Sequence, residues 1–306
     1  MKSAIVAVSV ATVWTNPESP RDLDRAALAV PADPRGWLSS LSIDDKLGFY
    51  DNNMIQTQAL YGTRVLVEEE QGGWSKVLIP DQACRKNELG YPGWIPSKQL
   101  APWSEVFDVQ AGQKLAQVTS DTAQLYTTDK KAELELAYLT RLPLLSETED
   151  GVIVATPAGE RFLRTEDVQL VRAQEPLETV VNRGEAIVQN GKRFLGLPYL
   201  WGGMSSYGYD CSGFAYNMHR SVGIEIPRDA SDQARAGEMV EKADLLPGDL
   251  LFFAFEEGTG RVHHVGIYIG NQHMIHSPDS RGAIEIVKLD DSYKLIKEHC
   301  ISRRYW

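Results

Sequence analysis

The chain has 306 residues, of which 43% are hydrophobic and 24% are charged, as in an ordinary globular protein. This length predicts two or three domains of about 100 to 200 residues each. The formal net charge of −11 argues against nucleic acid or an anionic membrane as a partner, and no run of about 18 apolar residues predicts a membrane-spanning helix.

The chain begins with Lys2 and a short apolar run at residues 4–11, which has some features of a signal peptide. Ser9 and Thr12 interrupt the run, however, and it meets Trp14 without a clear small-residue cleavage site. We therefore expect the first strand of the first domain here, with a signal peptide as the alternative.

Residues 39–50 are expected to form a helix, because Leu38, Leu41 and Leu47 are spaced for one face. Short strands with intervening turn residues then predict a small β-barrel, and residues 107–171 repeat the pattern more weakly. The expected strands of the first barrel are residues 58–67, 74–79 and 94–96.

A third domain is expected after a linker at residues 171–179. Its first helix would be capped by Thr179 and end near Gly196, and residues 246–253 predict a buried strand. The predicted domains are 1–105, a barrel with a helical insertion, 106–172, a second barrel, and 173–306.

The cysteines are only three, Cys84, Cys211 and Cys300, with no C-x-x-C pair. This usage is typical of a reducing cytoplasm, which is the expected location, and argues against a disulfide-stapled secreted domain. His263 and His264 are neighbours on an expected strand, where their side chains point to opposite faces. We therefore expect no metal site and no cofactor.

Cys211 follows Asp210 at the start of a helical apolar pattern that includes Phe214 and Met218. The first-turn N–H groups of a helix lack intrahelical partners and carry partial positive charge, so a thiolate is stabilised there. The alternative interpretation of an isolated cysteine is a small buried hydrophobic residue.

A thiol nucleophile needs a base, and His264 lies in an alternating strand at residues 262–270. A turn at Gly270 and Asn271 predicts a hairpin whose second strand carries His276. This geometry permits a nucleophile, a base and an orienting residue in line. Three other histidines are expected on the surface: His219, His263 and His273.

Four motifs occur in order over residues 175–306: P-Y-x-W-G-G, D-C-S-G-F, H-V-G-I-Y-I-G and M-I-H-S. Together they closely resemble the NlpC/P60 cysteine peptidases, papain-like enzymes that cut cell-wall peptides. The upstream region resembles the bacterial SH3-like domains of the γ-D-glutamyl-L-diamino acid endopeptidases, the YkfC-type dipeptidyl-peptidase VI group. The resemblance implies two small SH3-like β-barrels followed by an α+β papain-like catalytic domain.

The resemblance also implies a function. The chain would hydrolyse the γ-D-glutamyl-L-diamino acid bond of murein peptides with a free N-terminal L-Ala, releasing L-Ala-γ-D-Glu in cell-wall peptide recycling. Whether the diamino acid is diaminopimelate or lysine stays open, and we expect a monomer. The alternatives are a secreted peptidoglycan hydrolase with wall-binding SH3-like domains, and an acyl transferase or peptide-binding protein on the same scaffold.

In the implied mechanism Cys211 attacks the carbonyl, His264 transfers the proton and His276 orients His264. The backbone N–H of Cys211 would hold the oxyanion, with Tyr199 as the side-chain donor implied by the resemblance. Trp201 and the glycines at 202–203 would line the groove, the glycines letting backbone come close to substrate.

The remaining candidates would bind the substrate. Asp210 is expected to cap the helix, to bind the L-Ala ammonium, or both, and Ser212 to bind the D-Glu carboxylate. By resemblance, Tyr91 would close one end of the cleft near the free amine. Arg228, Asp229 and Ser231 are possible further contacts, with helix capping as the alternative for the last two.

Overall fold

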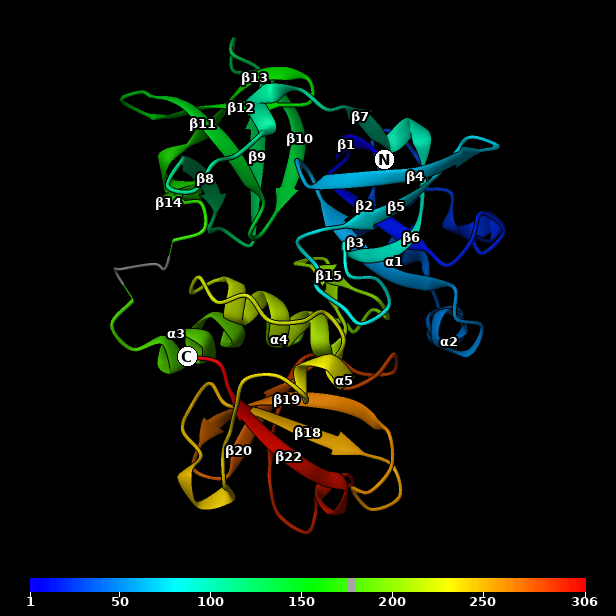
Figure 1. Cartoon of the computed structure of the whole chain (residues 1–306), viewed down its shortest axis with the longest axis vertical. Coiled ribbons are helices and arrows are strands. Elements are labelled where there is room, and N and C mark those ends of the chain that lie inside the picture. Colours follow the sequence, from blue (N-terminus) through cyan, green and yellow to red (C-terminus); the bar gives the residue numbers. More distant parts are fainter. Residues whose placement is uncertain (176–179) are drawn as a thin grey trace. The chain divides into compact units, whose positions relative to one another are not determined.

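A computed structural model describes residues 1–175 and 180–306, which divide into two compact units (Figure 1). The first unit contains two SH3-like barrels and the second is α+β, as expected. The domain limits at 105/106 and 172/173 stay predictions. The first unit comprises Met1–Asp81, Lys86–Glu175 and Ser205–Tyr207, and the second comprises Gln82–Arg85, Gly208–Trp306 and the described part of Pro176–Met204.

The first barrel is a seven-stranded sheet in the order β3-β2-β6-β5-β4-β1-β7. The single strand expected at the N-terminus is two strands, because the chain turns at residues 7–9 and both segments pair within the sheet. The strands are β1 (Lys2–Val6), β2 (Val10–Trp14), β3 (Ile55–Leu60), β4 (Arg64–Gln71), β5 (Trp74–Ile79), β6 (Tyr91–Pro96) and β7 (Leu100–Pro102).

The helical insertion of this barrel contains two helices, α1 (Pro34–Ser40) and α2 (Ile43–Asp51), instead of the one expected at residues 39–50. Ser42 separates them because it caps α2. Its hydroxyl accepts the Asp45 N–H at 3.1 Å, and the Asp45 carboxylate accepts the Ser42 N–H at 2.9 Å. This reciprocal capping box sets the start of α2.

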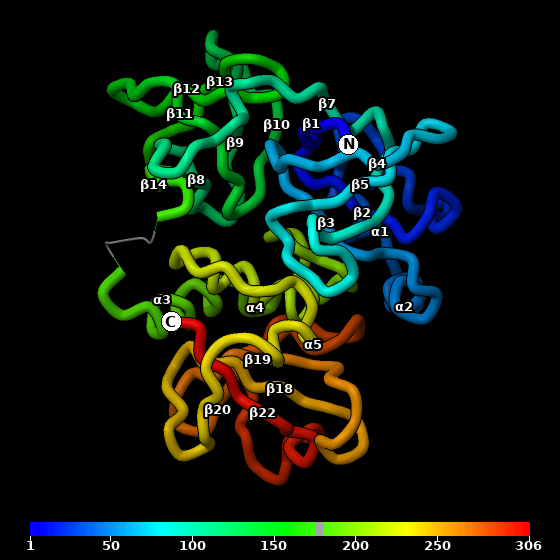
Figure 2. The backbone as a smooth tube through the Cα atoms, viewed as in Figure 1, coloured from blue at the N-terminus to red at the C-terminus, as the bar shows by residue number. Residues whose placement is uncertain are grey.

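The second barrel repeats the first strand for strand. Its order, β10-β9-β13-β12-β11-β8-β14, is that of the first barrel with every number raised by seven, so the predicted internal repeat is confirmed. Figure 2 shows the chain completing one barrel before the other. The strands are β8 (Lys114–Val118), β9 (Thr122–Tyr126), β10 (Ala132–Ala137), β11 (Arg141–Glu147), β12 (Gly151–Thr156), β13 (Gly159–Arg164) and β14 (Val168–Arg172).

A short hairpin turn, Ser205–Tyr207, belongs to the first unit although it immediately precedes the nucleophile motif in sequence. Tyr207 packs with Val10, Leu60 and Ala137, which come from both barrels. Its hydroxyl also donates a hydrogen bond to Glu135 at 2.8 Å. The turn is therefore held by apolar and polar contacts together.

The second unit is built on a six-stranded antiparallel sheet in the order β17-β22-β18-β19-β20-β21, with helices α3 and α4 packed on β19 and β20. Its elements are α3 (Arg183–Lys192), the first residue of β15 (Met204–Ser205), β16 (Gly208–Tyr209), α4 (Cys211–Arg220), α5 (Ala230–Gln233), β17 (Glu238–Met239), β18 (Leu250–Ala254), β19 (Val262–Gly270), β20 (His273–His276), β21 (Glu285–Lys288) and β22 (His299–Arg304).

Two expectations for this unit can be compared directly. The predicted cap Thr179 lies outside the described residues, and the side chain that caps α3 is Asn182, which accepts the Glu185 N–H at 3.2 Å. The buried strand expected at 246–253 is present as β18, whose five residues are all buried. It forms the middle of the sheet beside β19.

Candidate active site

Cys211 is the first residue of α4 and is half-buried. Asp210 caps this helix, as expected, because its carboxylate accepts the Gly213 N–H at 2.6 Å. A Cβ atom at Gly213 would lie 2.1 Å from the Gly203 carbonyl oxygen, so only glycine fits there. The D-C-S-G motif thus positions the thiol and lets the helix start pack closely.

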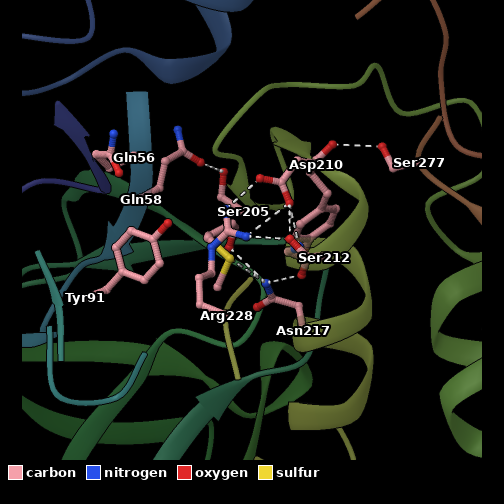
Figure 3. Close-up of polar contacts among 12 residues, drawn as sticks. Gln56, Gln58, Tyr91, Ser205, Asp210, Ser212, Asn217, Arg228 and Ser277 are labelled. Carbon is pink, nitrogen blue, oxygen red and sulfur yellow. Dashed lines mark hydrogen bonds and ion pairs between the residues drawn. The ribbon is translucent and has the colours of Figure 1, made fainter. Parts of the chain in front are cut away.

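Arg228 forms a buried ion pair with Asp210 (Figure 3). Its guanidinium donates to both carboxylate oxygens, at 2.6 and 3.2 Å, and to the Ser212 hydroxyl at 2.9 Å. Only 1% of Arg228 and 6% of Asp210 is exposed. A buried pair of this kind needs both members, because removing one leaves an uncompensated charge.

The chain around Arg228 is itself held in place. Its backbone N–H donates to the Ala83 carbonyl at 2.9 Å, within the second unit. The Gln233 side chain donates to the Ser212 carbonyl at 3.1 Å and to the Pro227 carbonyl at 2.8 Å. The segment 227–233 therefore connects to the start of α4 at two points.

Asp229 and Ser231 are not brought to Cys211 by any described hydrogen bond. Asp229 has the N-cap position of α5, but its side chain makes no capping hydrogen bond, and Ser231 lies half-buried within that helix. Their contact with substrate stays a prediction. Arg228, which the sequence analysis gave only as a possible contact, is the residue at the centre of this cluster, and nothing in the sequence pointed to Gln233.

His264 and His276 form a hydrogen-bonded pair on the adjacent strands β19 and β20. The Nε2 atom of His264 lies 2.8 Å from Nδ1 of His276, and the rings are nearly perpendicular at 78°. Both residues are buried, at 3% and 2% exposure. Burial lowers the pKa of His276 to about 4 and holds that of His264 well below 6.5, so both rings are neutral at pH 7.

The Cys211 thiol is neutral in the resting site as well. Burial, followed by the charge of Asp210, raises its pKa to about 12, and Arg228 and the Val265 N–H offset this only in part. The Ser212 N–H at the helix start lowers the pKa of the thiol, as expected, but desolvation and the capping carboxylate outweigh it in the resting site. Since His264 uses Nε2 toward His276, its Nδ1 is the nitrogen left for the thiol.

Tyr199 is 5% exposed, and burial followed by the charges of Cys211 and Asp210 raises its pKa. Its hydroxyl thus stays protonated and able to donate. Trp201 is half-buried in the following turn. A Cβ atom at Gly203 would lie 2.3 Å from the Gly208 carbonyl oxygen, so the packing of the hairpin requires glycine there. The approach of substrate to residues 202–203 stays a prediction.

Tyr91 lies in β6 of the first unit and is 2% exposed. The Lys86 ammonium lies over its ring, 4.2 Å from the centroid, and hydrogen-bonds its hydroxyl. Lys86 also donates to Gln56 at 2.9 Å. A role for Tyr91 at the substrate amine stays a prediction.

In residues 1–175 and 180–306, no three His, Cys, Asp or Glu side chains are arranged to hold a metal ion. None of the helices in this described part has the length and apolar character needed to cross a membrane. None of the three cysteines forms a disulfide with another described residue.

A cysteine at a helix start, beside a histidine pair on an antiparallel sheet, defines the site of a papain-like cysteine peptidase. The NlpC/P60 family model matches residues 196–304. The YKFC SH3b2 domain model matches residues 118–170, and the model of the bacterial dipeptidyl-peptidase Sh3 domain matches residues 51–100.

Similar proteins extend the match over nearly the whole chain. The γ-D-glutamyl-L-lysine dipeptidyl-peptidase of Bacillus subtilis is 44% identical over 97% of this chain and 96% of its own length. Its Bacillus cereus counterpart is 42% identical over 99% and 90%. The crystal structure of an NlpC/P60 family protein from Bacillus cereus gives a TM-score of 0.93 at 42% identity, covering 99% of both chains. This chain belongs to the NlpC/P60 family of cysteine peptidases.

Proposed function

We propose that this enzyme hydrolyses the γ-D-glutamyl-L-diamino acid bond of murein peptides that carry a free N-terminal L-Ala, and releases L-Ala-γ-D-Glu. The observation that carries the proposal is the identity of 44% with a γ-D-glutamyl-L-lysine dipeptidyl-peptidase over 97% of the chain, barrels included. Because the names of these relatives specify L-lysine, a peptide with L-lysine in the third position is the first substrate to test.

In the proposed mechanism, the unprotonated Nδ1 of His264 takes the Cys211 proton as the sulfur attacks the γ-carbonyl carbon. The resulting oxyanion accepts hydrogen bonds from the Cys211 N–H and the Tyr199 hydroxyl. His264 then protonates the leaving amine of the diamino acid, and the C–N bond breaks. Water, deprotonated by His264, hydrolyses the thioester and restores the thiol.

The cluster of Asp210, Ser212 and Arg228 would bind the L-Ala-γ-D-Glu part of the substrate, which forms the thioester with Cys211. The carboxylate of Asp210 would attract the L-Ala ammonium, and Ser212 with Arg228 would attract the D-Glu α-carboxylate. Both substrate charges would meet an opposite charge within hydrogen-bonding distance of the helix start. Tyr91 would complete the amine pocket, as the resemblance implies.

We further propose that the enzyme acts on peptides recycled in the cytoplasm. The three cysteines, none of which forms a disulfide, support a reducing compartment. Fractionation of cells that produce the tagged full-length chain, with known cytoplasmic and exported markers, tests this directly. Recovery with the exported marker would favour a wall hydrolase.

The activity is tested with L-Ala-γ-D-Glu-L-Lys, its diaminopimelate analogue and the N-acetylated form of each, with products identified by mass. Wild type is expected to release L-Ala-γ-D-Glu from the free peptides only. Cys211→Ala should abolish release, whereas Cys300→Ala, at another half-buried cysteine, should not. Equal cleavage of acetylated peptides would contradict the amine pocket, and no cleavage of any peptide would contradict the activity.

A further inference from the structure

The far side of His276 has an unexplained feature. Its Nδ1 is used by His264, but its Nε2 has no hydrogen-bond partner among the described residues, although the ring is buried. The Glu285 carboxylate lies 3.5 Å from this Nε2, within ion-pair distance and slightly beyond a good hydrogen bond. A buried polar atom without a partner is costly, and if Nε2 carries the proton, a small side-chain movement that closes this gap is favourable.

The placement of Glu285 follows from the sheet. His276 ends β20 and Glu285 begins β21, and the two are directly opposed cross-strand partners. Ser277 fixes this end of β20, because its hydroxyl donates to the Tyr209 carbonyl at 2.8 Å, just before the nucleophile motif (Figure 3). His276 is thus fixed relative to Cys211, with Glu285 behind it.

The other charged and titratable groups around His276 do not offer this contact. Asp279 pairs with Lys294 at 3.7 Å, and Lys294 acts on His276 only as a nearby positive charge. Tyr293 presents its ring to the imidazole at 87°, with 5.9 Å between centroids. Among the described residues, Glu285 alone is an ion-pair partner of Nε2.

The position of one proton on His276 decides what His264 can do. If His276 carries its proton on Nδ1, it donates to Nε2 of His264, and a neutral His264 must then be protonated on Nδ1, facing the thiol. If His276 carries it on Nε2, its Nδ1 accepts from His264, whose own Nδ1 is then a free base. Only the second arrangement can take the Cys211 proton.

We propose that Glu285 is a positioning residue that selects the Nε2–H form of His276 and so leaves Nδ1 of His264 unprotonated toward Cys211. The tautomer claim stands on the geometry, and only its effect on rate rests on the proposed function. Because the Glu285 side chain is 56% exposed, water can partly replace it. Its removal is expected to lower kcat roughly tenfold and to leave KM unchanged.

The test is nitrogen-15 NMR of histidine-labelled full-length protein, together with peptide kinetics, for wild type, Glu285→Ala and Glu285→Gln. Wild type should show His276 protonated on Nε2, and Glu285→Ala should shift population to Nδ1 and lower kcat. Glu285→Gln, whose amide oxygen can still accept, should lie between them. Glu241→Ala, at another exposed glutamate, is the control and should match wild type.

The tautomer readout needs no substrate, so loss of the proposed function and loss of this proposal are distinguishable. Protonation of His276 on Nδ1 in wild type would overturn the proposal. So would a Glu285→Ala protein with an unchanged nitrogen-15 pattern and a kcat within about twofold of wild type.

Discussion

The two halves of the active site use buried polar groups in opposite ways. On the helix side, Asp210 and Arg228 are charged and satisfy each other at 2.6 Å. On the sheet side, His264 and His276 are equally buried, but burial lowers the pKa of each so that they are neutral. Fixed charge suits recognition of a charged dipeptide, whereas a neutral imidazole suits the uptake and release of a proton.

The two halves meet at Cys211, where the charges of the helix side act on the pKa of the thiol. Asp210 raises the pKa of the thiol, and Arg228 lowers it. The two charges of the ion pair therefore partly cancel in their effect on the pKa of the nucleophile.

The largest effect is expected on the sheet side. His264→Ala should lower kcat/KM by about 10³ to 10⁴-fold, because no other base replaces Nδ1. His263→Ala is the matched control, since its ring contacts Glu298 and stacks on Phe255 instead. Peptide hydrolysis by the two purified variants measures the difference, and equal losses would assign the effect to the strand and not to the base.

The next effect concerns the ion pair. Arg228→Met should reduce the free energy of unfolding by about 3 to 5 kcal/mol, because Asp210 is left buried and unpaired. Adding Asp210→Asn should recover part of the loss by removing that charge. Urea denaturation of both variants gives the values, and a loss below about 1 kcal/mol in the single variant would show that the pair is not needed for stability.

A third effect is the dependence of stability on pH. Burial lowers the pKa of His219 in the folded chain from 6.5 to about 4. The unfolded chain therefore binds more protons between these values, and the contribution of His219, on the order of 3 kcal/mol, is complete above pH 6.5 and lost as pH falls toward 4.

Unfolding free energies measured from pH 7 to 4 test this effect with His219→Gln, which can still hydrogen-bond the Ala215 carbonyl. The unfolding free energy of the variant should fall less steeply than that of wild type, because the contribution of His219 is gone. Some decline should remain, because His276 titrates in the same direction. Parallel curves would show that His219 does not contribute.

The smallest effect is expected at Ser212. Ser212→Ala removes one hydroxyl from the charged cluster and should raise KM roughly tenfold for L-Ala-γ-D-Glu-L-Lys with little change in kcat. Ser277→Ala, at a hydroxyl bound to the Tyr209 carbonyl, is a control that should not alter KM. A fall in kcat alone would place Ser212 on the catalytic side of the comparison.

The parts of the site that follow local patterns could be predicted from the sequence. Alternation along 262–270 and the turn at 270–271 correspond to β19 and β20, and the strand expected at 74–79 is β5. The helix start at Cys211 was also expected, because capping by Asp210 depends on residues close in the chain. Periodicity and capping are local properties, which a sequence shows directly.

Contacts between distant residues could not be predicted in the same way. Arg228 reaches Asp210 through the tertiary fold, and no spacing rule marks that pair. His219 was expected on the surface but is fully buried, because α4 is enclosed on every side, with residues 212–219 all buried. The break between α1 and α2 was missed because the leucine spacing continues across it, while the Ser42 cap ends the helix.

The most direct test of the division between binding and chemistry is a structure of Cys211→Ala with bound L-Ala-γ-D-Glu-L-Lys. We predict the D-Glu α-carboxylate at Ser212 and Arg228, the L-Ala ammonium at Asp210, and the γ-carbonyl carbon facing residue 211 and His264. A peptide bound in the opposite direction, with its lysine at Asp210 and Arg228, would contradict this division.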